Sequence, residues 1–149
     1  MKDGADLTLK TVRAIETGNY TPEDQTSFVK PSDKLKPAPK IFKDDCRINW
    51  KKKAEDIYDF IRGLSPYPTA WTEIKKENEV LSLKVFRCTK EIVQEQTEIG
   101  SIHTDGKTFA KVAVKDGFIN LMDIQLAGRK KMNIEEFLRG FSFEGWKLI

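Results

Sequence analysis

The most regular hydrophobic pattern in the chain lies between residues 54 and 64, where apolar side chains recur every three or four positions. This spacing is typical of a helix whose apolar stripe packs on a core. The stripe consists of Ala54, Ile57, Tyr58, Ile61 and Leu64. The helix is not expected to continue past Leu64. Glycine at position 63 loses more backbone entropy than other residues when it becomes helical, and the prolines within 65–68 lack the amide donor that a helix requires. The pattern predicts a helix that ends near Leu64, followed by a strand that starts within 69–72.

After this helix the pattern changes to an alternation of apolar and polar positions, which predicts strands. Leu81, Leu83 and Val85 lie on one face of such a strand, and residues 75–79 are expected to form the turn before it. Residues 89–98 fit either a loop or an exposed strand, because their apolar content is too low to decide.

Two Asp-Gly dipeptides, Asp105-Gly106 and Asp116-Gly117, predict two-residue hairpin turns, since these residue types tolerate the positive φ that such turns require. The turns would join strands at 99–104, 107–114 and 118–126 into a meander.

The end of the chain carries a loop and a short helix in this interpretation. Gly128 ends the last long strand, and Arg129, Lys130 and Lys131 follow on a loop. Asn133, with Glu136 three residues later, has the pattern of a capping box and predicts a helix through Leu138. The aromatic tail at 141–149 receives no assignment.

The first 38 residues form a separate region. Leu7, Val12 and Ile15 recur at roughly helical spacing, so a helix is expected over 3–17. Residues 19–38 contain three prolines and no sustained periodicity, which predicts an extended connector. The expected division is a helix at 1–18, a linker at 19–38 and one domain at 39–149.

Composition and charge narrow the class of protein. With 149 residues, 39% hydrophobic and 33% charged, the sequence predicts one soluble domain with an additional segment. It shows no apolar run of membrane-spanning length and no signal peptide, so a cytoplasmic protein that does not contact membrane is expected. Cys46 and Cys88 lack the spacing of a metal or redox pair and are interpreted as reduced structural thiols.

Catalytic chemistry is not evident in the sequence. The single histidine, His103, lies beside a predicted hairpin turn, where a solvated side chain is the usual interpretation. We find no glycine-rich phosphate loop, no H-E-x-x-H motif and no nucleophile elbow. We therefore expect no catalytic residue, no cofactor site and no metal site in this chain.

Four motifs in fixed order carry a resemblance to a known family. They are DDCRINW at 44–50, IRGLSPYPTAW at 61–71, DGFINLMDIQLAGRKKM at 116–132 and EEFLRG at 135–140. Together they resemble the C-terminal domain of the methionyl-tRNA formyltransferases over roughly residues 38 to 140. Asn49 stands where that family more often has aspartate, and Cys46 stands where a small residue is usual.

The resemblance implies a fold and a role that composition alone does not give. The fold would be mainly β with short helices, an oligonucleotide-binding-like open β-barrel. Residues 1–18 would be the last helix of a preceding catalytic domain that this chain lacks; a helix that packs on the barrel or on a partner chain is the alternative. The intact enzyme would transfer a formyl group from 10-formyltetrahydrofolate to initiator methionyl-tRNA, while this part would help to bind the tRNA without catalysing the reaction.

Basic residues are the candidates for such tRNA contacts. The positive charge is concentrated in residues 27–71, which contain ten basic and six acidic groups. The candidate residues are Lys40, Lys43, Arg47 and Lys51, which Lys52 and Lys53 follow, together with Arg129, Lys130 and Lys131. A solvated face is the alternative interpretation of each group. Trp50 and Trp71 are expected to pack in the core rather than to stack on bases.

Two other functions remain open at this point. The domain could belong to a sugar-nucleotide or another folate-dependent formyltransferase. It could instead be a free-standing module that binds RNA or a protein.

Overall fold

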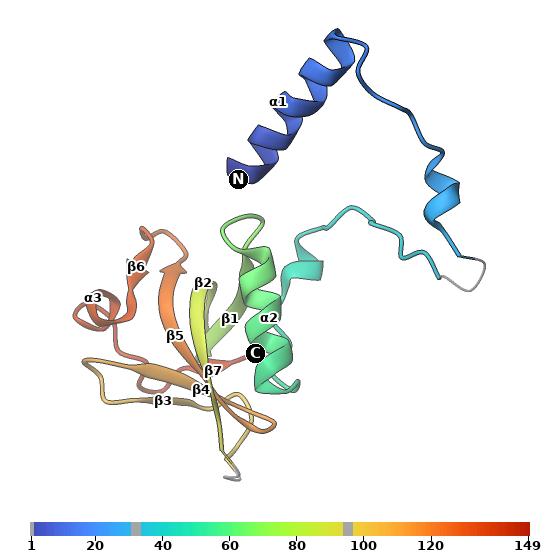
Figure 1. Cartoon of the computed structure of the whole chain (residues 1–149). Coiled ribbons are helices and arrows are strands. Elements are labelled where there is room, and N and C mark those ends of the chain that lie inside the picture. The colour runs from blue at the N-terminus through green and yellow to red at the C-terminus, as the bar shows by residue number, and fades with distance from the viewer. Residues whose placement is uncertain (1, 31–33, 94–96) are drawn as a thin grey trace. The chain divides into compact units, whose positions relative to one another are not determined.

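The computed structural model describes residues 2–30, 34–93 and 97–149 (Figure 1). The chain separates into two compact units, Met1–Pro39 and Lys40–Ile149, which are described one at a time. In the first unit, α1 spans Lys2–Glu16 and a short 3-10 helix spans Gln25–Phe28. The expected helix over 3–17 is confirmed, and none of the residues of α1 is buried.

The second unit is built on one antiparallel sheet that curls into a nearly closed barrel (Figure 1). The strands run in the order β3-β4-β5-β2-β1-β7, and β6 pairs with β5 outside this path. Their bounds are Ala70–Lys76 for β1, Glu79–Ile92 for β2, Ile102–Thr104 for β3, Ala110–Val114 for β4, Gly117–Leu126 for β5, Met132–Asn133 for β6 and Lys147–Leu148 for β7. The helices of this unit are the 3-10 turn Asp44–Cys46, α2 at Ala54–Leu64 and α3 at Ile134–Leu138. The mainly β barrel implied by the resemblance is confirmed.

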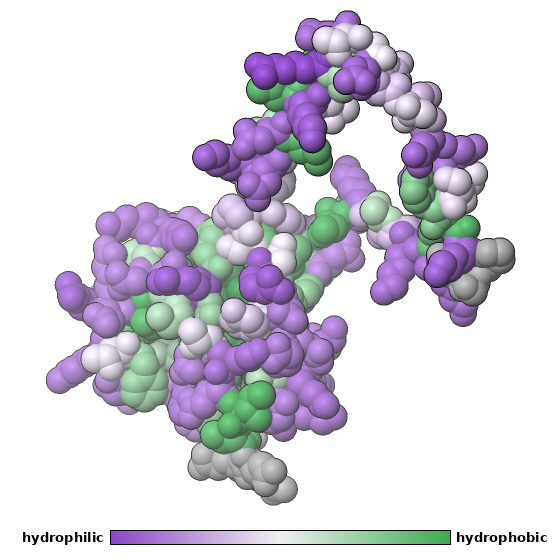
Figure 2. Space-filling view, viewed as in Figure 1, coloured by the Kyte–Doolittle hydropathy of each residue, from purple (hydrophilic) through white to green (hydrophobic). Residues whose placement is uncertain are grey.

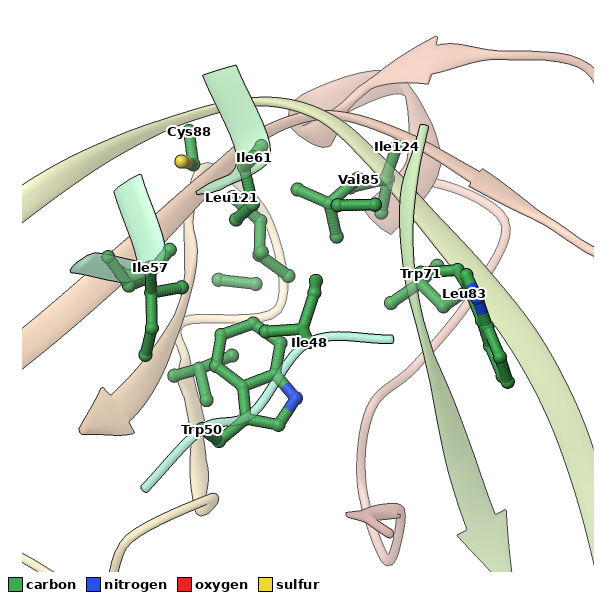
Figure 3. Packing of buried hydrophobic residues seen from close by; sticks show 14 of the residues in the cluster. Ile48, Trp50, Ile57, Ile61, Trp71, Leu83, Val85, Cys88, Leu121 and Ile124 are labelled. Carbon is green, nitrogen blue, oxygen red and sulfur yellow. The ribbon is translucent and has the colours of Figure 1, made fainter. Parts of the chain in front are cut away.

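The core of the barrel is closed on one side by α2, whose apolar stripe confirms the predicted helix. Ile57 and Ile61 are each 1% exposed and point from α2 toward β2 and β5 (Figure 3). The indole of Trp50 lies inside this cluster, where its Nε1–H donates to Thr72 Oγ1 at 3.0 Å, while Trp71 lies at the edge of the cluster. The expectation that both tryptophans pack in the core is confirmed, since both are buried.

The first helical turn of α2 is capped from a distant part of the chain. Lys53 occupies the N-cap position without making a side-chain cap. Instead, the Asp116 carboxylate accepts the Ala54 N–H at 2.7 Å, from the turn between β4 and β5. A carboxylate at a helix N-terminus satisfies an amide that otherwise lacks a partner and interacts favourably with the helix dipole.

The two Asp-Gly dipeptides form different turns from those predicted. The strands β3 and β4 are joined by a five-residue loop at 105–109, in which Asp105 Oδ1 accepts the N–H groups of Lys107, Thr108 and Phe109. The hydrogen bond from the Thr108 hydroxyl, followed by those from the backbone amides, holds the pKa of Asp105 well below its usual range. The prediction of a two-residue turn at Asp105-Gly106 is therefore wrong.

The second hairpin has a two-residue turn, but one residue earlier than predicted, at 115–116. Gly117 already pairs with Val114 as the first residue of β5. Its φ is +150°, and a Cβ at this position would lie 2.0 Å from the Glu91 carbonyl oxygen. Glycine is required here because the backbone of β2 passes too close for any side chain.

The strand β2 extends further than the alternation indicated. It continues through 89–92, so this part of the undecided segment is a strand, whereas 94–96 lie outside the described residues. Its register with β5 shifts between Val85 and Cys88, which marks a β-bulge. Such a bulge changes which side chains face the core: Leu83 and Val85 are buried before it and Cys88 after it, while Phe86 and Arg87 both point outward.

The C-terminal segment completes the sheet. The side chain of Asn133 accepts the Glu136 N–H at 2.8 Å, which confirms the predicted cap of α3. In the aromatic tail, for which the sequence predicts no element, Phe141 and Phe143 pack against Phe137, and Trp146 packs against Phe141. The tail then adds β7 to the free edge of β1.

Candidate nucleic-acid interface

The predicted basic residues of the first group lie on one segment, residues 40–53, which we call the basic segment. Its backbone is fixed to β1 by two hydrogen bonds. Trp71 Nε1–H donates to the Lys43 carbonyl at 2.7 Å, and the Ile48 N–H donates to the Trp71 carbonyl at 2.8 Å. The side chains of Lys40, Lys43 and Lys51 are exposed. The backbone is held at Lys43 by the Trp71 indole and at Lys51, whose N–H donates to Asn49 Oδ1 at 3.0 Å.

The cations of the basic segment differ in their surroundings. Arg47 is paired with Glu73 at 2.7 Å, and it also donates to the Ile149 carbonyl at 3.0 Å. Lys40 and Lys43 lie over the rings of Phe42 and Trp71, with their ammonium groups 5.3 and 5.1 Å from the ring centroids.

The lysines of the basic segment differ from Arg47, since none of them has a carboxylate partner among the described residues. In the described part of the chain, no carboxylate lies within 4.0 Å of Lys40, Lys43 or Lys51. The charge on these lysines is therefore not compensated by a direct ion pair within the unit.

The second predicted group, at 129–131, is divided by the structure. Arg129 Nη1 donates to the Gly140 carbonyl at 3.1 Å and its guanidinium lies over the Phe141 ring, so this side chain ties the loop to the end of α3. Lys130 pairs with Glu136 at 3.0 Å. Lys131 points to another surface, where it lies 3.7 Å from Asp123.

Lys131 belongs to a groove of about 330 Å³ between α2 and the bulge of β2. Arg62 and Arg87 line the same groove, and Arg87 pairs with Asp123 at 3.2 Å. Neither arginine is among the residues predicted from the sequence. Arg87 was not predictable, because nothing in the alternation of β2 indicates the bulge that turns it outward. The i,i+3 position of Arg62 relative to Asp59, at 3.1 Å, was readable from the helical spacing.

A further pocket brings together two of the predicted residues. Arg47 and Lys51 line a pocket of about 400 Å³, with Ile99, Leu148 and Ile149 on its other side. Ile99 begins the strand predicted at 99–104, whereas Leu148 and Ile149 come from the C-terminal segment, whose structure the sequence did not predict.

His103 and the two cysteines pack against neighbouring residues of the barrel unit. His103 is half-buried on β3, where its Nε2 lies 2.9 Å from Ser101 Oγ and its ring meets the edge of Phe118. Cys46 and Cys88 are free and buried, as expected, and burial raises the pKa of the Cys88 thiol to about 12.

Neither a metal site nor a membrane span is evident in the parts of the chain that the structure describes. No group of three potential metal ligands occurs among residues 2–30, 34–93 and 97–149. Within the same ranges, no helix combines the length and apolar content that crossing a bilayer requires.

These features define a class: a small antiparallel barrel domain with a cationic surface. Exposed lysines on a fixed backbone can bind a polyanion through its phosphates. The chain belongs to the family described as "Formyl transferase, C-terminal domain", which matches residues 40–142.

Curated relatives with high similarity to this chain carry the name methionyl-tRNA formyltransferase. The chain is 51% identical to the enzyme of Phocaeicola vulgatus over 93% of this chain and 43% of the relative. It is 49% identical to that of Parabacteroides distasonis over 95% of this chain and 44% of the relative. The chain thus spans less than half the length of these relatives, and it matches their C-terminal part.

A solved structure shares the fold. The chain superposes on HypX from Aquifex aeolicus with a TM-score of 0.60 at 16% identity, over 92% of this chain and 24% of that one. At this identity the likeness concerns the fold alone.

Proposed function

We propose that this chain provides the C-terminal tRNA-binding part of a cytoplasmic formyltransferase that acts on initiator methionyl-tRNA. Formyl transfer from 10-formyltetrahydrofolate would take place in a catalytic domain that precedes the barrel. In this proposal, residues 1–18 are the last helix of that domain, 19–38 are the linker and 39–149 are the tRNA-binding domain. The names of the relatives support this assignment.

The observation that carries the proposal is the set of uncompensated lysines on the basic segment. Lys40, Lys43 and Lys51 have no carboxylate partner among the described residues. A phosphate that approaches them need not displace an existing ion pair. Because the backbone at Lys43 and Ile48 is already hydrogen-bonded to β1, little backbone entropy is lost when RNA binds.

The other predicted cations contribute less in this proposal. Arg47, Lys130 and Lys131 each have a carboxylate within 4.0 Å, and Arg129 donates to a backbone carbonyl. A phosphate must compete with these partners, so each contact gains less free energy. We rank the basic segment above the loop at 129–131 as the main tRNA contact.

The proposal is tested by replacing matched sets of lysines and measuring tRNA affinity as a function of salt. Each phosphate contact contributes a slope of about 0.7 to 0.9 in the logarithm of affinity against the logarithm of salt concentration. The triple variant Lys40→Ala, Lys43→Ala, Lys51→Ala should therefore flatten the slope by about 2 to 3. The measurement is fluorescence anisotropy with labelled initiator tRNA.

A control variant removes the same charge elsewhere. It replaces three exposed lysines outside the proposed interface, Lys75, Lys107 and Lys147, by alanine. It should leave the slope close to that of the unmodified chain. If both triple variants change the slope equally, the basic segment has no special role. If the unmodified chain does not bind tRNA, the proposed function is wrong.

A further inference from the structure

An exposed aromatic pocket lies where the basic segment meets the end of α2. The pocket has a volume of about 270 Å³, and its lining includes Phe42, Lys43, Tyr67, Trp71 and Lys84. We call it the Tyr67 pocket. Figure 2 shows pale and green side chains gathered at the C-terminal end of α2, beside otherwise hydrophilic surface.

Tyr67 is the most exposed aromatic residue among the large hydrophobic side chains of the described chain, with 88% of its surface accessible. The loop that presents it is nevertheless well held. Thr69 closes the loop, since its N–H donates to the Leu64 carbonyl at 2.9 Å and its hydroxyl donates to the Pro66 carbonyl. Pro66 and Pro68 restrict the backbone on both sides of Tyr67. The backbone at Tyr67 is thus held in position while the ring itself remains exposed.

Phe42 presents a second accessible ring to the same pocket, 61% exposed. Its backbone is also fixed: the Phe42 N–H donates to Asp45 Oδ2 at 2.8 Å, and the Phe42 carbonyl accepts the Cys46 thiol at 3.4 Å. Trp71 offers no comparable face, because it is 8% exposed and Lys43 and Arg47 lie over its ring.

The charge of the pocket is positive. Lys43 and Lys84 line it, and none of its described lining residues is acidic. In the described chain, neither lysine has a carboxylate within 4.0 Å. Accessible rings beside uncompensated cations match a ligand that has flat aromatic groups joined by phosphates.

We propose that the Tyr67 pocket binds an unpaired nucleotide of RNA, whose base stacks on Tyr67 or Phe42 while Lys43 and Lys84 contact the adjoining phosphates. The proposal rests on the proposed function and extends it, since it assigns a contact to a base in addition to the phosphate contacts of the basic segment. A base inside a duplex cannot use this pocket, because both of its faces are already stacked on neighbouring base pairs. The pocket therefore selects single-stranded RNA.

Stacking and charge have different signatures in a binding experiment. Loss of a stacking ring lowers affinity without changing the salt slope, because no counterion is released at the ring. Loss of a phosphate-binding lysine flattens the slope. The two contributions can be separated within one set of variants.

The experiment compares a labelled 12-nucleotide oligoadenylate with a blunt RNA duplex of the same length, by fluorescence anisotropy. Tyr67→Ala should weaken binding of the oligoadenylate about five-fold or more, with an unchanged salt slope and unchanged binding of the duplex. Tyr67→Phe keeps the ring and should bind as the unmodified chain does. Phe109→Ala, which removes an aromatic ring 40% exposed outside the pocket, should have no effect.

Several outcomes would overturn the proposal. If Tyr67→Ala and Phe42→Ala both bind the oligoadenylate normally, no base stacks in the pocket. If that result occurs while the unmodified chain still binds tRNA with a steep salt slope, the proposed function stands and only the stacking site is wrong. If the unmodified chain binds neither the oligoadenylate nor tRNA, both proposals fail. An equal loss of affinity for single-stranded and duplex RNA would also overturn it, because Tyr67 would then support RNA binding without stacking on an unpaired base.

Discussion

Replacement of Gly117 by alanine should destabilise the barrel much more than the same change at Gly106. At Gly117, an added Cβ would lie 2.0 Å from the Glu91 carbonyl oxygen and 2.9 Å from the Ile92 Cα. Both are backbone atoms of β2, so no side chain can move aside. Relief requires β5 to move away from β2, which strains the pairing of Ile92 with Gly117.

The magnitude follows from two contributions. Overpacking costs about 1–3 kcal/mol, and a sparsely populated backbone conformation at φ +150° costs about 1–3 kcal/mol more. The sum of about 2–6 kcal/mol corresponds to a fall in Tm of roughly 8 °C or more, or to loss of folding. At Gly106, φ is +71° and no atom lies within 4 Å of the added Cβ. Only the left-handed backbone cost of about 1–2 kcal/mol remains there.

The assay is thermal unfolding of Gly117→Ala and Gly106→Ala, monitored by circular dichroism with urea denaturation as a second measure. The reasoning would be refuted if both variants lost the same stability, since the close approach of β2 to Gly117 would then have no energetic consequence.

Three further predictions concern the cap, the thiols and the first unit. Asp116→Ala should cost about 1–2 kcal/mol because the Ala54 N–H loses its acceptor, and Asp116→Asn, which keeps an oxygen, should cost less in urea denaturation. Because burial raises the pKa of Cys88 to about 12 from 9.0, the folded state keeps a proton that the unfolded state releases. The free energy of unfolding should therefore fall as pH rises above about 9. Because both thiols are buried, Ellman's reagent at pH 8 should label Cys46 and Cys88 only after denaturant is added. Removal of residues 1–39 should change the Tm of the barrel by less than about 2 °C, because every residue of the buried core cluster lies between Cys46 and Phe143; a larger fall would mean that the first unit packs on the barrel.

The local elements were predictable from the sequence where one periodicity dominated. The stripe from Ala54 to Leu64 gave both ends of α2, and the Asn133 cap gave the start of α3. Residues 118–126 were expected as a strand, and β5 differs from this by a single residue. These features depend on neighbouring residues, so the sequence pattern contains the information.

Features that depend on contacts distant in sequence were not predictable. Two identical Asp-Gly dipeptides adopt different turns, because Asp105 binds its own loop whereas Asp116 caps a helix 62 residues earlier. The bulge that turns Arg87 outward, and the pairing of β7 with β1, likewise arise from the partner strand.

The candidate site was likewise predictable only in part. The sequence identified the basic residues, but not which of them are already paired. Lys130 and Glu136 are six residues apart, and Lys131 and Asp123 are eight apart, so neither pair follows from helical spacing. The exposure of the aromatic ring of Tyr67 was likewise not predictable, because it depends on how the loop that carries Tyr67 closes.

The central claim is that the barrel unit binds tRNA through phosphate contacts made by its basic surface. The most direct test is the affinity of the unmodified chain for initiator tRNA, measured by anisotropy between about 50 and 200 mM salt. Three to four phosphate contacts predict that the logarithm of affinity falls with the logarithm of salt at a slope of about −2 to −4. A slope near zero, or no binding at the lowest salt, would contradict the account.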